Sequence, residues 1–154
     1  VNSASGARRG QDLPAAEPWY RTMDCTDAYV KMCQKAEEIQ RLWSPVEGDH
    51  FVDELCHVSI VNPILLEHLN KSFKERKREN YVWLPRQDQL QEMIISLFKG
   101  NCYWMMEECY KFMKLPYPVK SESMEQIWLT FIMQQLYKKQ WLPGKGEWIK
   151  KEAH

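Results

Sequence analysis

Two places in the 154-residue chain set a histidine beside another metal ligand, and metal chemistry would be expected there first. Asp49 precedes His50, and Cys56 precedes His57. A structural metal site needs several such ligands in one place, usually from spacings such as C-x-x-C or H-x-x-x-H. Neither pair has such a spacing, and Cys56 and His57 would point to opposite faces of a strand. We therefore predict no metal site and no cofactor.

A cysteine nucleophile is the next chemistry that the composition allows. Cys25 or Cys56 would need a histidine base, for which His50, His57 and His68 are the candidates. A catalytic thiol also needs an electropositive setting and a third residue that orients the base. The sequence indicates neither, so we predict no catalytic residue and rank an enzyme last among the functions.

The most distinctive polar cluster is Arg86, Gln87, Asp88 and Gln89, directly after Pro85. At a helix start, the free N–H groups together with Arg86 could hold an anion or a carboxylate of a partner. The alternative is local: Asp88 stabilises the helix dipole, and Gln87 or Gln89 satisfies backbone groups of the neighbouring strand. We favour the local interpretation and keep the four residues as partner-binding candidates.

A basic segment offers a second kind of binding. Tyr81, Trp83 or Trp104 could stack on bases while the cations contact phosphates. Glutamates interrupt the segment, however, and the 21 basic residues of the chain are balanced by 21 acidic ones, whereas nucleic-acid-binding domains are usually basic. Nucleic-acid binding is therefore the alternative function, and its candidate residues are Lys71, Lys74, Arg76, Lys77 and Arg78.

The elements that must position these residues are organised around a corner at Pro85. Residues 81–84 are aromatic and β-branched, which predicts a short strand. From residue 86 to 99 the apolar residues recur at helical spacing, and proline suits the first turn of that helix. The segment 63–77 stays open between a helix and a strand followed by an exposed loop. The other expected elements are helices over 26–43, 101–114 and from 121–123 onward, one or two strands within 50–61, and a hairpin over 141–149.

These elements predict an α+β fold in one domain over residues 23–154. We expect a small mixed or antiparallel sheet of three or four strands, which includes the terminal hairpin, with four to five helices packed on it. Residues 1–22 are poor in large apolar side chains and predict a flexible arm. We also expect that the natural chain starts at Met23.

Composition narrows the class of protein. Hydrophobic residues make up 44% of the chain and charged residues 27%, as in globular proteins. No apolar run is long enough for a membrane span, and no secretory signal is visible. The five cysteines form no dense disulfide framework. We expect a soluble, cytoplasmic protein with reduced thiols.

The order of motifs resembles small uncharacterised proteins of phages and prophages. The resemblance covers about residues 23–150, and its most specific part is Trp-Leu-Pro-Arg-Gln-Asp-Gln at residues 83–89. It is supported by Met-Cys-Gln-Lys-Ala at 32–36 and Ser-Met-Glu-Gln-Ile-Trp-Leu at 123–129. The resemblance implies a viral or prophage origin and a location in the host cytoplasm, and it implies no activity.

We therefore predict a non-enzymatic accessory protein that binds a host or viral protein. Aromatic and methionine-rich helices would form the contact surface, because such side chains dominate binding hot spots. The candidate anchors are Trp104, Phe112, Trp141 and Trp148. The identity of the partner and the oligomeric state stay open.

Overall fold

The computed structural model describes residues 23–115 and 123–150. Its first two helices are α1 (Asp27–Lys35) and α2 (Glu37–Leu42), where the sequence predicts one helix. The break lies at Ala36, whose ψ of 67° is not helical. The apolar stripe continues across the break, and all its members are buried: Tyr29, Met32, Cys33, Ala36, Ile39 and Trp43.

A three-stranded antiparallel sheet follows, in the order β2-β1-β3. Its strands are β1 (His50–Val52), β2 (Val58–Ile60) and β3 (Val82–Leu84), all in predicted segments. Phe51 lies opposite Trp83 across β1 and β3, and one face of the sheet carries both rings. Trp43 packs against this face, with its ring centroid 6.0 Å from Phe51 and 6.2 Å from Trp83.

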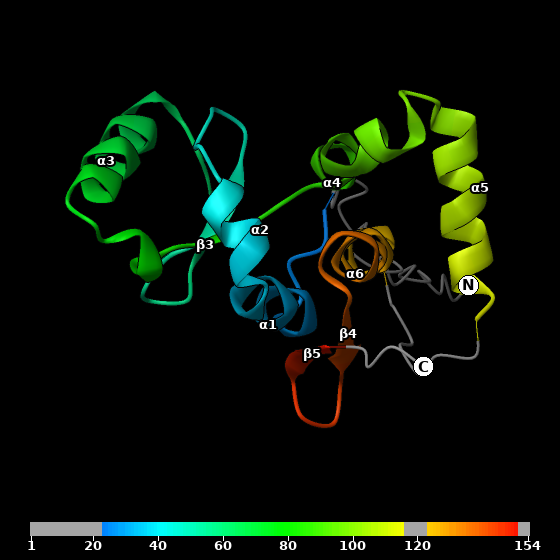
Figure 1. The fold of residues 1–154 in the computed structure, drawn as a ribbon. Helices are drawn as coiled ribbons and strands as arrows, with labels where there is room; N and C mark the ends of the chain where they lie inside the picture. The colour runs from blue at the N-terminus through cyan, green and yellow to red at the C-terminus, as the bar shows by residue number, and fades with distance from the viewer. Residues whose placement is uncertain (1–22, 116–122, 151–154) are drawn as a thin grey trace, which may run out of the picture.

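The segment that the sequence left open is a helix, α3 (Pro63–Lys74), which lies beside the sheet (Figure 1). Asn62 Oδ1 accepts a hydrogen bond from the Leu65 N–H, and Pro63 occupies the first turn, where no N–H is needed. A short 3₁₀ turn, η1 (Arg78–Asn80), leads from α3 into β3.

After Pro85 the chain is helical, as predicted. Helix α4 (Gln87–Ile94) ends in a 3₁₀ turn, η2 (Ile95–Phe98), and Lys99 and Gly100 both have positive φ. Helix α5 (Cys102–Met113) then starts at Asn101, whose side chain accepts a hydrogen bond from the Trp104 N–H. The predicted helix over 86–99 is therefore shorter by its last turn.

Helix α6 (Met124–Tyr137) is the centre of the helical half, and α1, α4 and α5 pack around it (Figure 1). It has no polar face for most of its length, because Trp128, Leu129, Phe131, Ile132 and Met133 are all buried. A helix that is apolar all round belongs inside a protein, which is where α6 lies.

The terminal hairpin, β4 (Lys139–Leu142) and β5 (Glu147–Lys150), forms a sheet of its own. The expectation that it would join the central sheet was wrong, because it packs instead on α1 and α6. Trp141 and Trp148 lie directly opposite each other in this pair, with ring centroids 5.0 Å apart.

The α+β fold class is confirmed: six α-helices surround two small antiparallel sheets in the described residues. The number of helices exceeds the prediction because the first helix breaks and the segment from residue 63 is helical. The predicted N-terminal arm, residues 1–22, lies outside the described residues.

One buried carboxylate joins the starts of α1 and α6. Asp24 accepts hydrogen bonds from the Thr26 N–H at 2.8 Å, from Ser123 Oγ at 2.5 Å and from Gln126 Nε2 at 2.8 Å. Burial raises the pKa of Asp24, but the hydrogen bonds from Ser123, Thr26 and Gln126 together outweigh burial and hold this pKa below its usual value. Asp24 is therefore a charged link between two helix N-termini, which favour negative charge.

Candidate protein-binding surface

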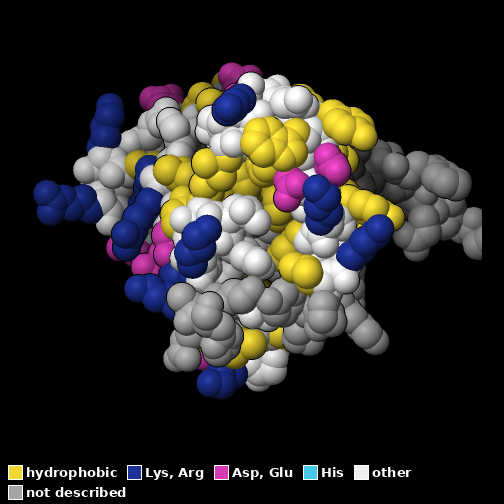
Figure 2. Space-filling view, turned by 45° about the vertical axis from the view of Figure 1, so that its right-hand side comes forward, with side chains coloured by type: hydrophobic (Ala, Val, Ile, Leu, Met, Phe, Trp, Pro, Cys, Tyr) yellow, Lys and Arg dark blue, Asp and Glu magenta, His cyan; other side chains and the backbone are white. Residues whose placement is uncertain are grey.

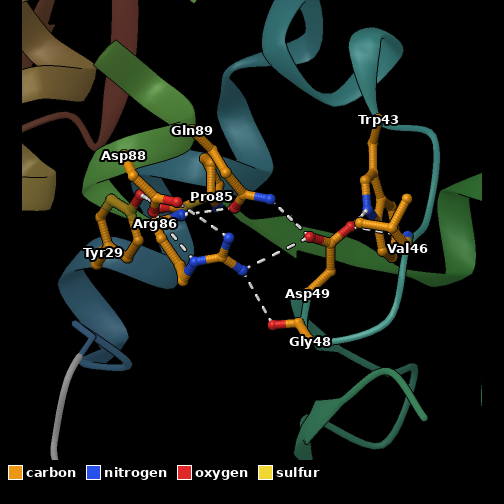
Figure 3. A network of polar contacts seen from close by, with 9 residues as sticks. All are labelled: Tyr29, Trp43, Val46, Gly48, Asp49, Pro85, Arg86, Asp88 and Gln89. Atoms are coloured by element: carbon orange, nitrogen blue, oxygen red, sulfur yellow. Dashed lines mark hydrogen bonds and ion pairs between the residues drawn. The ribbon is translucent and has the colours of Figure 1, made fainter. Parts of the chain in front are cut away.

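Two members of the polar cluster at the start of α4, Arg86 and Gln89, point toward the turn before β1 (Figure 3). The Arg86 guanidinium donates to Asp88 through Nε and Nη2, both at 3.1 Å, and to the Gly48 carbonyl through Nη1 at 3.0 Å. Nη1 also lies 3.8 Å from the Asp49 carboxylate. All three guanidinium nitrogens therefore have partners within the chain.

Asp49 is the buried centre of this network. Its carboxylate accepts hydrogen bonds from Trp43 Nε1 at 2.9 Å, from the Val46 N–H at 3.0 Å and from Gln89 Nε2 at 2.6 Å. The carboxylate thus holds together the end of α2, the turn before β1 and the first turn of α4. A buried carboxylate is tolerated only with such a set of donors.

The remaining members of the cluster act on the helix start. Gln89 Oε1 accepts a hydrogen bond from the Arg86 N–H at 3.0 Å, which satisfies a backbone donor before α4. The hydrogen bond from Arg86 lowers the pKa of Asp88, which lies in the first turn, where a negative charge is favourable. Gln87 is half-buried in the same turn. These contacts are those expected of residues that hold the fold.

The basic segment is divided by its contacts. Arg78 lies across the end of α2, where its guanidinium donates to the carbonyls of Gln40, Arg41 and Trp43 at 3.2, 2.9 and 2.8 Å. Its Cζ also lies 4.5 Å from the centre of the Phe73 ring. Arg78 thus satisfies carbonyls at a helix C-terminus, which is a favourable place for a cation.

The other four cations are at the surface. Lys77 Nζ donates to the Glu75 carboxylate at 2.9 Å, and this hydrogen bond raises the pKa of Lys77. Lys71 and Lys74, on α3, and Arg76, just after it, are exposed. These three cations have no ion pair within residues 23–115 and 123–150, and three such charges are a small electrostatic footprint for nucleic acid.

The cysteine and histidine candidates are dispersed. The candidate thiols Cys25 and Cys56 are exposed, whereas Cys33 and Cys109 are buried. Burial raises the pKa of Cys33 strongly and that of Cys109 to about 11, so these two thiols stay protonated at neutral pH. His57 lies 3.7 Å from the Asp53 carboxylate, and His68 Nε2 lies 3.0 Å from the Tyr81 hydroxyl. Residues 23–115 and 123–150 contain no group of three or more side chains suited to hold a metal ion.

The four candidate aromatic anchors differ in how far they are buried. Trp141 and Trp148 are buried, and Trp148 Nε1 donates to the Met32 carbonyl at 3.0 Å. The prediction that Trp141 and Trp148 contact a partner is corrected, because the hairpin uses both side chains to cover the core of the protein. Phe112 is half-buried against Phe131, at a centroid distance of 5.4 Å. Trp104 remains, partly exposed.

The outer face of α5 carries several exposed large apolar side chains. Its exposed side chains, with their exposed fractions, are Tyr103 (80%), Met106 (45%), Tyr110 (57%) and Met113 (48%). Exposed Cys102 lies on the same side of the helix, since residues three or four apart are neighbours there. Figure 2 shows apolar side chains gathered on this side of the molecule, with a few charged side chains between them. We call Tyr103, Met106, Tyr110 and Met113 the α5 stripe.

Sequence reasoning found part of this surface. The helical spacing of the sequence places six apolar residues on one stripe of this helix, of which only Met105 and Cys109 are buried: Cys102, Met105, Met106, Cys109, Tyr110 and Met113. The sequence pattern did not include Tyr103, although the four members of the α5 stripe follow one another at spacings of three, four and three residues. Trp104 is turned by about 100° from Tyr103 and packs edge-on against Phe98, at 5.3 Å, so it lies outside the stripe.

Comparison with protein-family models, with curated protein sequences and with solved structures finds no match for this chain. Within the described segments, the longest and most apolar helices still fall short of what a bilayer crossing requires.

Proposed function

We propose that this chain is an accessory protein that binds another protein through the α5 stripe, and that the part of the partner that docks there is an α-helix. The observation that carries this proposal is the set of four large apolar side chains exposed on one helix at spacings of three, four and three residues. Such a patch on a protein surface marks an interaction site far more often than it serves stability.

The spacing supports a helical partner. Apolar residues that alternate by three and four positions form the seam at which two helices pack side by side. A partner helix that lies along α5 would cover all four side chains of the stripe. A partner strand or a small ligand would cover only a part of this three-turn surface.

The side-chain types support a protein partner as well. Methionine adapts its shape to different partner surfaces, and tyrosine combines a large ring with a polar hydroxyl. Both Met106 and Met113 lie next to a tyrosine of the stripe. Such a mixture is characteristic of contact surfaces that exist alone in water and are covered on binding.

Charges limit the stripe on one side. Lys111 Nζ pairs with Glu107 at 3.2 Å and with Glu108 at 2.8 Å. Lys114 Nζ lies 4.2 Å from the centre of the Tyr110 ring, so it covers an end of the stripe without removing it from solvent. A partner helix with polar residues beside its own apolar seam fits this border.

The origin and setting belong to the same proposal. Phage or prophage origin rests on the resemblance of residues 83–89, and it would place the protein and its partner in the host cytoplasm. Arg86, Asp88 and Gln89, within that segment, make internal contacts, which supports a structural and not a catalytic reason for the motif.

The test is affinity capture from a nuclease-treated lysate, read by mass spectrometry, with the double substitution Met106→Glu and Tyr110→Glu. The two changes place carboxylates in the middle of the stripe, and we expect the specifically retained protein to disappear. Leu42→Glu is the matched control, because Leu42 is an exposed apolar residue of another helix. It should retain the partner.

The captured protein must then bind the purified chain directly, and a peptide of its docking helix should compete. A partner that is retained equally by the double variant would contradict the α5 stripe as its site. Material that binds only while nucleic acid is intact would instead support the basic segment, with Lys71, Lys74 and Arg76 as its exposed residues.

A further inference from the structure

We propose that the free edge of β2 pairs with β2 of a second copy of this chain, so that two three-stranded sheets join into one. The proposal does not depend on the α5 stripe, because α5 lies on the other side of the molecule from α3 and the central sheet (Figure 1).

The hydrogen-bond phase of the sheet fixes which backbone groups of β2 are free. The Asp53 N–H donates to the His57 carbonyl, and the Val61 N–H donates to the Asp49 carbonyl. Hydrogen-bonded pairs recur at every second residue of an antiparallel ladder, so Phe51 and Ser59 form the pair between them. The N–H and C=O groups of Val58 and Ile60 therefore point away from β1.

These groups have no partner in the described part of the chain. The same alternation continues from β1 to β3, so the N–H and C=O groups of Trp83 should point away from β1. At this edge of the sheet, a side chain binds these groups. Gln40 Oε1 accepts from the Trp83 N–H at 2.8 Å, and Gln40 Nε2 donates to the Trp83 carbonyl at 2.9 Å. One edge of the sheet is thus closed by a side-chain amide, and the other is open.

The side chains of the open edge suit another apolar strand. Val58 is 44% exposed and Ile60 54% exposed, and both lie on the same face because they are two residues apart. Residues 58–60 include no charge and no proline, which are two of the features with which proteins protect a strand edge. The edge is protected only by its short length of three residues.

A second copy fits this edge without a mismatch. A two-fold axis at Ser59 places Val58 opposite Ile60 of the second copy, and Ile60 opposite Val58. Both outward-pointing residues then form hydrogen-bonded pairs, each of which exchanges two N–H···O bonds. The net charge of zero adds no long-range repulsion between copies.

Only three residues of each copy form the pairing, so the dimer is weak. A three-residue strand buries far less than the roughly 1,200 Å² typical of stable complexes. We therefore infer a reversible dimer that grows with protein concentration. Ser59 meets its own copy as a non-hydrogen-bonded pair, whose Cα atoms lie about 4.5 Å apart, within reach of a disulfide.

The decisive experiment is disulfide trapping of the full chain. In a background with Cys25, Cys56 and Cys102 changed to serine, Ser59→Cys should give a covalent dimer as the main product of mild oxidation. Ile64→Cys in the same background is the control, because Ile64 is more exposed but lies outside β2. It should stay mainly monomeric.

Sedimentation velocity over a range of concentrations gives the second readout. The wild-type chain should move toward the dimer as concentration rises, and Ile60→Lys should remain a monomer while Ile64→Lys behaves as wild type. Equal trapping of both cysteine variants would overturn the proposal. So would a dimer that persists in Ile60→Lys but is lost when the α5 stripe carries Met106→Glu and Tyr110→Glu.

Discussion

The surroundings of Asp49 and the outer face of α5 are opposites. Around Asp49, polar groups from α2, the turn before β1 and α4 satisfy one another inside the protein. On α5, four large apolar side chains remain in water. Arg86, Asp88 and Gln89, the most distinctive polar cluster in the sequence, make contacts within the fold, whereas the apolar residues of α5 stay exposed. The comparison teaches that a polar cluster indicates a binding site only when some of its hydrogen-bonding groups have no partner within the chain.

The strongest test of the hydrogen-bond network around Asp49 is Asp49→Ala. It leaves Trp43 Nε1, the Val46 N–H and Gln89 Nε2 without their acceptor, and it removes one of the two carboxylates near Arg86. We expect the free energy of unfolding to fall by about 3 kcal/mol or more, since each buried unpaired donor is costly. Chemical denaturation measures this loss.

Asp88→Ala is the matched control, because Asp88 also pairs with Arg86 but is exposed. A surface ion pair contributes about 0–1 kcal/mol, so this variant should stay close to wild type. Equal losses for the two variants would show that the burial of Asp49 carries no special weight.

Substitutions in the basic segment distinguish a structural role of Arg78 from a role in binding nucleic acid. Arg78→Lys keeps the charge but cannot reach three carbonyls with a planar fork, so we expect a loss of about 2 kcal/mol in the free energy of unfolding. The double change Lys71→Gln and Lys74→Gln removes two exposed charges and should leave stability nearly unchanged. If the lysine variant is as stable as wild type, Arg78 does not hold the end of α2.

Gln40 tests the closed edge of the sheet. Gln40→Glu retains an acceptor for the Trp83 N–H but loses the donor to the Trp83 carbonyl, and we expect a loss of about 1 kcal/mol. Hydrogen exchange at the Trp83 amide reports the change directly. Gln34→Glu, on the exposed side of α1, is the control and should alter neither quantity.

The open surface should give the smallest effect on stability. The double variant Met106→Glu and Tyr110→Glu alters only exposed side chains, and surface substitutions usually change the free energy of unfolding by less than about 0.5 kcal/mol. Thermal unfolding beside the wild-type chain checks this. A large loss would mean that the α5 stripe serves the fold, and the contrast with Asp49 would disappear.

Local patterns in the sequence predicted most of the elements. Helical spacing predicted a helix over 26–43, and the apolar residues that recur at that spacing from Tyr29 to Trp43 are all buried. In the structure, the side chains of Thr26, Asn101 and Ser123 cap α1, α5 and α6. The break at Ala36 was not predictable, because alanine is the best helix former and nothing in its neighbours interrupts the pattern. The turn is imposed by packing and not by local preference.

Long-range contacts account for what the sequence did not reveal. The partners of Arg78 lie 35 to 38 residues away, and those of Trp148 lie 116 residues away, so neither could be inferred from spacing. The wide apolar arc of α5 was visible, but which half of it the core covers depends on the position of α6. Burial of an aromatic residue is a property of the assembled fold.

The link between Asp24 and the start of α6 has a consequence for synthesis on the ribosome. Asp24 and Gln126 are 102 residues apart, and Trp148 and Met32 are 116 apart, so α1 can meet α6 and the hairpin only after most of the chain has emerged, later than it can meet β3. Contacts of such high sequence separation form late, and partly made chains expose the surfaces that await them. During translation the side of α1 that packs on α6 and the hairpin therefore stays uncovered until these elements leave the exit tunnel.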